Sequence, residues 1–294
     1  MKKSFQGSMV ALVTPFRDGK VDEAKLRELV EFQVKNGTDA IVPCGTTGES
    51  PTLNHEEHRR VVEVTIEAAA GRIPVVAGTG SNSTAEAIAL TEHAKQAGAD
   101  GVLMVCPYYN KPTQKGLVAH YTAVAEAVDI PIILYNIPGR TGVNMLPETV
   151  ATLAELKNIV GIKEASGSLE QMTEVITRCG GRITVVSGDD TLTLPLMAVG
   201  GEGVISVIAN ILPKESADLT RAALNGDWKR AKELHLRTFP LCKAMFYETN
   251  PIPVKTAMQL LGRLNGELRL PLAPMSEANR EKLQKAMKAY GLLS

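Results

Sequence analysis

The chain has 294 residues, of which 44% are hydrophobic and 22% are charged, a composition typical of a folded globular protein with an ample core. Its 32 basic and 32 acidic residues leave no formal net charge, which argues against nucleic acid or an anionic membrane surface as a partner. No apolar run reaches the roughly 18 residues of a membrane-spanning helix, and the start of the sequence lacks the apolar segment of an export signal, so we expect a cytoplasmic protein.

Short, continuously apolar runs recur along the sequence, with helical patterning between them. Continuous rather than alternating apolar runs are typical of parallel strands covered on both faces. Eight such units predict an α/β fold, the (β/α)8 TIM barrel. The alternative is a doubly wound open sheet, but no G-x-G-x-x-G opens the first helix. The eight predicted strands begin near Met9, Ala40, Pro74, Gly101, Pro131, Ile159, Ile183 and Gly203.

The pattern changes after the eighth strand. From about Pro213 onward the sequence is helical and contains no further strand candidate. Pro251 and Pro253 are predicted to break one connection in this region. We therefore predict a barrel catalytic domain over residues 1–224 and a C-terminal α-helical extension over residues 225–294. The helices expected in the tail cover residues 217–224, 228–236 and 277–290.

Lys163 is the most informative single residue because it lies within the apolar run of residues 159–166. Burial without a partner disfavours a charged amine, and a neutral lysine amine is a nucleophile toward carbonyl carbon. The alternative is a lysine near a strand end whose ammonium reaches water. On the strand alone, the two interpretations carry equal weight.

Polar residues at the other strand ends bear on this question, because a TIM barrel carries its active site there. The amides and hydroxyls of Thr46 and Thr47 are suited to hold a small carboxylate, although a plain turn with a helix cap at Asn54 is the alternative. Tyr135 is suited to move protons or simply to pack in the core. Arg140 is suited to clamp a second carboxylate, or to remain on the surface.

Three motifs in register on the predicted strands, together with a segment of the helical tail, resemble those of the dihydrodipicolinate synthase family. This family groups pyruvate-dependent class I lyases and aldolases, including N-acetylneuraminate lyase, and the resemblance implies a (β/α)8 barrel with a helical C-terminal domain. Arg140 and Thr141 after a Pro-Gly pair resemble the synthase branch. The matching segments are Gly45-Thr46-Thr47-Gly48-Glu49, Tyr135-Asn136-Ile137-Pro138-Gly139-Arg140-Thr141, Gly161-Ile162-Lys163-Glu164-Ala165 and Asn250-Pro251-Ile252-Pro253-Val254-Lys255.

The resemblance implies condensation of pyruvate with L-aspartate 4-semialdehyde to give 4-hydroxy-tetrahydrodipicolinate, a precursor of lysine and diaminopimelate. Lys163 would form the Schiff base and enamine, so no cofactor is expected. Tyr135 would relay protons together with Thr46 and with Tyr109, which would be contributed across a dimer interface. The nearest alternatives are another pyruvate-dependent aldolase or lyase with a different aldehyde, and a barrel that only binds a keto acid.

The same resemblance implies the groups that bind substrate. Thr46 and Thr47 would hold the carboxylate of pyruvate, and Arg140 would bind that of aspartate semialdehyde. Gly188 and Ile205 would line the site through backbone groups. A homotetramer, built as a dimer of dimers, is also implied.

His55 and His58 share one helix face, and a solvated or interface pair is the plain interpretation. No further metal ligands accompany them, and four dispersed cysteines predict no zinc site. The family resemblance implies a feedback site for L-lysine at the dimer interface, in which Glu86 would pair with the effector's ammonium. The positions of this implied site are Ser50, His55, His58, Asn82, Glu86 and Tyr108.

Overall fold

The computed structural model describes residues 5–294, and within them eight parallel strands form one sheet in the order β4-β1-β10-β9-β8-β7-β6-β5. A bridge between Ile41 and Val75 joins the two end strands, so the sheet closes into a barrel. The predicted barrel and all eight of its strands are confirmed. Their bounds are β1 Gly7–Ala11, β4 Ala40–Val42, β5 Val76–Gly78, β6 Gly101–Val105, β7 Ile132–Asn136, β8 Ile159–Glu164, β9 Thr184–Ser187 and β10 Gly203–Ser206.

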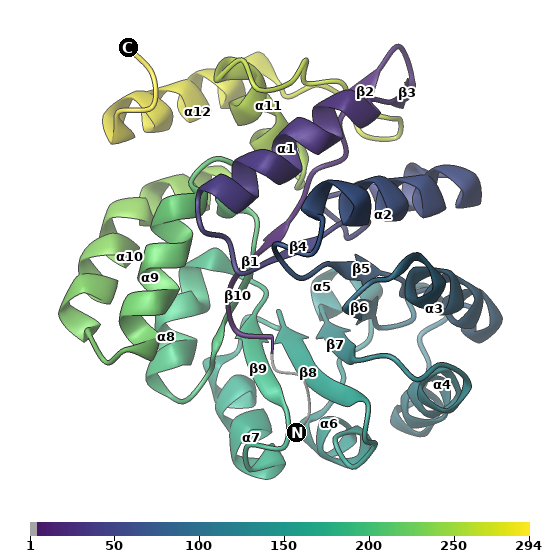
Figure 1. Cartoon of the computed structure of the whole chain (residues 1–294). Helices are drawn as coiled ribbons and strands as arrows, with labels where there is room; N and C mark the ends of the chain where they lie inside the picture. The colour runs from purple at the N-terminus through teal and green to yellow at the C-terminus, as the bar shows by residue number, and fades with distance from the viewer. Residues whose placement is uncertain (1–4) are drawn as a thin grey trace.

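Helices alternate with these strands and surround them (Figure 1). The helix after β4 begins at the capping box predicted around Asn54, whose side chain accepts from the Glu57 amide while Glu57 accepts from the Asn54 amide. The helices of the barrel region are α1 Glu23–Lys35, α2 His55–Ala69, α3 Thr84–Ala97, α4 Gln114–Ala127, α5 Pro138–Thr141, α6 Pro147–Leu153, α7 Leu169–Cys179, α8 Thr193–Ala198 and α9 Pro213–Leu224.

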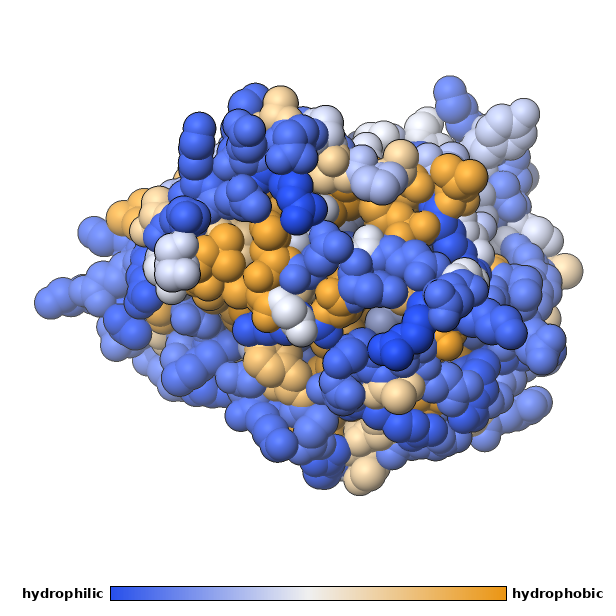
Figure 2. Space-filling view, turned by 90° about the horizontal axis from the view of Figure 1, so that it is seen from above, coloured by the Kyte–Doolittle hydropathy of each residue, from blue (hydrophilic) through white to orange (hydrophobic). Residues whose placement is uncertain are grey.

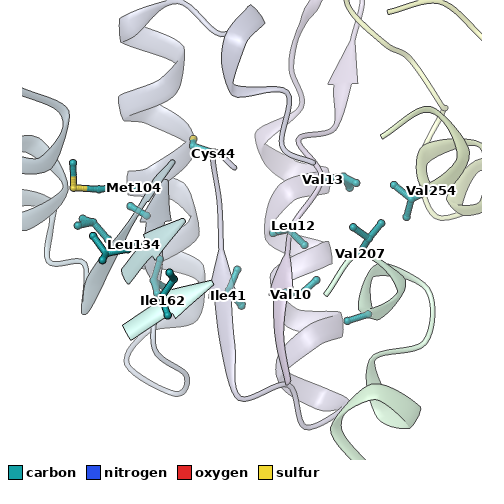
Figure 3. Packing of buried hydrophobic residues seen from close by; sticks show 14 of the residues in the cluster. Val10, Leu12, Val13, Ile41, Cys44, Met104, Leu134, Ile162, Val207 and Val254 are labelled. Carbon is teal, nitrogen blue, oxygen red and sulfur yellow. The ribbon is translucent and has the colours of Figure 1, made fainter. Parts of the chain in front are cut away.

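Two apolar layers follow from the alternation of side chains along each strand. One layer fills the barrel interior and includes Leu103, Ile133, Tyr135 and Ile205. The other lies between the strands and the helices. Figure 3 shows this outer layer, with Val10, Ile41, Met104, Leu134 and Ile162 labelled on different strands.

The C-terminal extension shares the outer core with the barrel. It consists of α10 (Trp228–Ala244), α11 (Ile252–Leu260) and α12 (Glu277–Tyr290). Val254 of α11 is fully buried and extends toward Val207 after β10 (Figure 3). Because one apolar cluster spans both parts, α11 is held firmly against the barrel.

Two features of the chain differ from the sequence-based predictions. Pro251 lies in the connection between α10 and α11, as predicted, but Pro253 stands in the first turn of α11, a helix that was not predicted; proline fits there because its missing N–H is not needed. A two-stranded hairpin, β2 (Phe16–Arg17) with β3 (Lys20–Val21), follows β1 and was not predicted, because two residues carry too little pattern.

The surface seen from above is mainly hydrophilic, with apolar side chains gathered in several places (Figure 2). Among the helices of residues 5–294, none combines the length and apolar character needed to cross a membrane.

Candidate active site

The pairing of β7 with β8 contains an irregularity that decides which way Lys163 faces. Ile132 pairs with Ile159, whereas Ile133 pairs with Gly161, so Val160 is an extra residue on β8. Successive side chains point to opposite faces of a regular strand, and the bulge interrupts this alternation. Every later side chain therefore takes the face opposite to the one that uninterrupted alternation from Ile159 would give it.

Beyond this bulge, Lys163 faces the barrel interior. Its register partner is Tyr135, a member of the interior layer, whereas the preceding residue, Ile162, belongs to the outer layer. Lys163 Nζ lies 4.3 Å from the centroid of the Tyr135 ring, and the lysine is only 5% exposed. A Cβ atom at Gly188 would lie 3.0 Å from Lys163 Cε, so glycine there leaves room for the lysine chain.

Lys163 has no salt bridge within residues 5–294, unlike the other deeply buried lysine, Lys255, which pairs with Glu49. The neighbouring carboxylate, Glu164, faces the other side of the sheet. There it accepts hydrogen bonds from the Ser166 amide at 2.7 Å and from the Asn136 side chain at 3.1 Å. The acid next to Lys163 on the strand is therefore engaged elsewhere, and within the described residues the amine of Lys163 has no salt-bridge partner.

A cavity of about 510 Å³ opens near these residues. Its wall includes Tyr135, the residue on whose ring the amine of Lys163 packs, whereas Lys163 itself does not line it. Eight of the residues predicted from the sequence line the cavity, namely Thr46, Tyr135 and Arg140 from the substrate set and Ser50, His55, His58, Glu86 and Tyr108 from the lysine set.

The other predicted residues are not among those that line the cavity. Thr47 and Ile205 are buried, with exposed fractions of 2% and 0%. Tyr109, in contrast, is 89% exposed and has a left-handed backbone with φ of 71°. Asn82 donates from its side chain to the Tyr108 carbonyl at 3.2 Å.

The Gly45–Ser50 loop after β4 is fixed from beneath. The Glu49 carboxylate lies 2.5 Å from Lys255 Nζ, and both side chains are completely buried. Lys255 also donates to the Thr14 carbonyl at 2.9 Å, and Glu49 accepts from the Arg269 amide at 3.1 Å. Burial lowers the pKa of Lys255, while the Glu49 charge opposes that shift.

Arg140 lies on the short helix α5, in the wall of the cavity. Its Nη2 donates to the main-chain carbonyl of Asn250 at 3.1 Å. The side chain of the same Asn250 donates to Thr47 Oγ1 at 2.9 Å. One residue of the C-terminal extension thus contacts two of the predicted substrate-binding residues.

His55, His58 and Glu86 lie together on one side of the cavity. Glu86 accepts a hydrogen bond from Ser81 and lies 2.8 Å from His55 Nε2, and these two contacts lower its pKa. His58 Nε2 lies 2.9 Å from the Gly78 carbonyl, and burial lowers the pKa of this histidine to about 4. Its Nδ1 is buried without a hydrogen-bond partner in the described chain.

Comparison with known proteins gives one consistent result. The sequence model of the Dihydrodipicolinate synthetase family matches residues 4–290. The chain belongs to the dihydrodipicolinate synthetase family. A curated 4-hydroxy-tetrahydrodipicolinate synthase from Geobacter sulfurreducens is 65% identical over 98% of this chain and 100% of its own length.

Two solved structures of family members contain bound ligands. The dihydrodipicolinate synthase of Acinetobacter baumannii, complexed with pyruvate, is 49% identical with a TM-score of 0.97 and covers 99% of this chain and 100% of its own. The enzyme from Cyanidioschyzon merolae, with lysine bound, is 45% identical with a TM-score of 0.96 over the same shares. Both support the barrel architecture of this family member.

The contacts of two residues in the C-terminal extension of this dihydrodipicolinate synthetase family member escaped prediction. Asn250 and Lys255 were noted in a motif but given no role, since their partners Thr47 and Glu49 lie 203 and 206 residues away. Cys44 lines the cavity, but burial raises the pKa of its thiol, which disfavours the reactive thiolate. Within residues 5–294, no group of three or more His, Cys, Asp or Glu side chains is placed to hold a metal ion.

Proposed function

We propose that this chain is a 4-hydroxy-tetrahydrodipicolinate synthase, a lyase that joins pyruvate to L-aspartate 4-semialdehyde. The observation that carries the proposal is Lys163, a buried amine packed on Tyr135 and without a salt bridge in the described chain. A lysine amine in its uncharged form attacks a keto carbon, and no carboxylate of the described chain forms a salt bridge with Lys163. The identity to the Geobacter sulfurreducens synthase over the whole chain supports the same assignment.

The proposed reaction needs no cofactor, because the Schiff base itself draws electrons from the substrate. Lys163 Nζ bonds to C2 of pyruvate, and the keto oxygen leaves as water. The imine acidifies the methyl group, which loses a proton to give an enamine. The enamine carbon attacks the aldehyde, and the substrate's own amine then closes the ring and displaces Lys163. Tyr135 is the proton relay in these steps.

Two carboxylate sites support the choice of these two substrates. Thr46 and Thr47, with the amides of their loop, are the proposed site for pyruvate. Arg140, on the cavity wall, is the proposed site for the semialdehyde. A sugar-acid lyase of the same family would have no need of a cation at that strand end.

Borohydride trapping tests the central step. Pyruvate and borohydride together should add one reduced adduct per chain, located by peptide mass spectrometry on Lys163. Lys255 serves as the internal control, because it is equally buried but paired with Glu49. Lys163→Ala should abolish the adduct and turnover while leaving the melting temperature nearly unchanged. An unmodified Lys163, or near-normal turnover in Lys163→Ala, would reject the mechanism, and turnover with N-acetylneuraminate instead of the semialdehyde would reject the substrate.

We also propose that L-lysine inhibits the enzyme by binding beside His55, His58 and Glu86. The Glu86 carboxylate, with its lowered pKa, suits the effector's ammonium. The lysine-bound relative from Cyanidioschyzon merolae supports this assignment. Lysine should reduce turnover of the wild type, and Glu86→Gln should weaken that inhibition at least about tenfold, the loss expected for a charged hydrogen bond. Unchanged turnover at millimolar lysine would contradict the site.

We also propose that the enzyme is a cytoplasmic homotetramer, built as a dimer of dimers. The 89% exposure of Tyr109 supports a side chain that reaches into a partner's site. Mixing inactive Tyr109→Phe chains with inactive Lys163→Ala chains tests this, because shared sites would restore some activity. No recovery in mixed dimers would contradict a shared site.

A further inference from the structure

Asn250 contacts both proposed substrate sites at once. It lies between α10 and α11 and is only 5% exposed. Its side-chain Nδ2 donates to Thr47 Oγ1 at 2.9 Å, and its main-chain carbonyl accepts from Arg140 Nη2 at 3.1 Å. The two contacts use different atoms, so they can be separated by mutation.

The side-chain contact fixes the direction of the Thr47 hydroxyl. An amide NH2 group only donates, so Thr47 Oγ1 must act as the acceptor in this bond. The hydroxyl proton of Thr47 then remains available for another acceptor. A carboxylate offers only acceptor oxygens, so a threonine held in this way is suited to bind one.

The amide of Asn250 also carries a cost that simple packing would not require. Its Oδ1 is buried without a hydrogen-bond partner in the described chain. A buried acceptor left unpaired is unfavourable, and such groups call for an explanation. The donor function toward Thr47 supplies a reason for an amide at this position.

We propose that Asn250 is a positioning residue that turns the Thr47 hydroxyl proton toward the carboxylate of the keto acid, while its main-chain carbonyl orients Arg140 at the second site. The inference rests on the proposed function, because it takes Thr47 as a ligand of pyruvate. Asn250 itself touches neither reacting carbon.

Asn250→Asp is the sharpest test, because aspartate keeps the shape and reverses the bond. A carboxylate accepts a hydrogen bond from the Thr47 hydroxyl, so the hydroxyl proton points toward residue 250 and no longer toward the substrate. The pyruvate concentration that half-saturates borohydride trapping should rise at least about tenfold, as for a lost hydrogen bond to a charged group. The KM for the semialdehyde should change less than about twofold, because the contact to Arg140 uses the main chain.

A role in packing alone predicts the opposite order. Asn250→Ala would then be the worse variant, and Asn250→Asp would behave as the wild type. On the proposal, Asn250→Ala frees the hydroxyl to rotate and raises the half-saturating pyruvate only about threefold, less than a full charged hydrogen bond. If Asn250→Asp does not fold, Asn250→Ala decides: the half-saturating pyruvate concentration should rise more than the KM for the semialdehyde. Equal rises in these two quantities would overturn the proposal.

Two controls isolate the effect. Asn158→Asp makes the same change at a buried amide that donates to the Ala125 and Val128 carbonyls, and it should leave pyruvate half-saturation unchanged. In a Thr47→Val background, the penalty of Asn250→Asp should largely vanish, whereas a persistent penalty would mean direct charge repulsion and overturn the proposal. If wild-type chains trap no pyruvate, the proposed function fails; if they trap it and Asn250→Asp traps it equally well, only the inference fails.

Discussion

The buried pair of Lys255 and Glu49 offers a demanding test of how the C-terminal extension supports the site. Lys255→Met removes the only salt-bridge partner, within residues 5–294, of a Glu49 carboxylate that is completely buried. Breaking a buried pair on one side costs about 3–5 kcal/mol, because the remaining charge is left uncompensated. For 294 residues the unfolding entropy is about 0.6 kcal/mol/K, so the melting temperature should fall by about 5–8 °C.

Thermal and urea denaturation of three variants complete this test. Lys255→Met combined with Glu49→Gln should recover most of the loss, because removing both charges of a buried pair is often close to neutral. Lys157→Met is the control, since its pair with Asp129 is 3.3 Å long and largely exposed, and its melting temperature should stay near that of the wild type. A small drop in the melting temperature of Lys255→Met, or no recovery of the melting temperature in the double variant, would refute the reasoning.

Three further outcomes are expected. Burial lowers the pKa of His58 from 6.5 to about 4, so neutral His58 supports the fold fully above pH 6.5 and this support is lost as the pH falls through 4. The free energy of unfolding should therefore fall by about 3 kcal/mol across this window in the wild type but not in His58→Gln. Identical curves of unfolding free energy against pH for the two proteins would contradict the prediction. Gly188→Ala places a methyl group 3.0 Å from Lys163 Cε and should lower kcat about tenfold to a hundredfold, with normal activity counting against the crowding. Arg140→Ala should raise the KM for the semialdehyde at least about tenfold without changing pyruvate trapping, and an equal loss of trapping would contradict its assigned role.

The sequence was sufficient for the barrel because each strand is a short apolar run that parallel pairing buries on both faces. It also placed Lys163 on the sixth strand of the barrel. It could not tell which face the lysine takes, since this depends on the extra residue Val160, a property of the pairing between β7 and β8. A pattern along one strand contains no information about register with its neighbour.

The contacts from the C-terminal extension that support the site could not be predicted from the sequence, for a related reason. Asn250 reaches Thr47 across 203 residues, and Lys255 reaches Glu49 across 206. Such contacts exist only once α11 has packed on the barrel, and α11 was itself missed because proline at a helix start resembles proline in a break. Burial of a charged residue is visible in a sequence only when its neighbours are apolar.

The bulge at Val160 determines which of two adjacent side chains faces the interior of this barrel. Lys163 and Glu164 are adjacent, one facing the interior and the other the helices. If the same residues paired with β7 without the bulge, Lys163 would face the helices and Glu164 would face the interior, where the amine is now. The chemistry of this barrel therefore depends on a local irregularity in strand pairing as well as on the identity of the reactive residue.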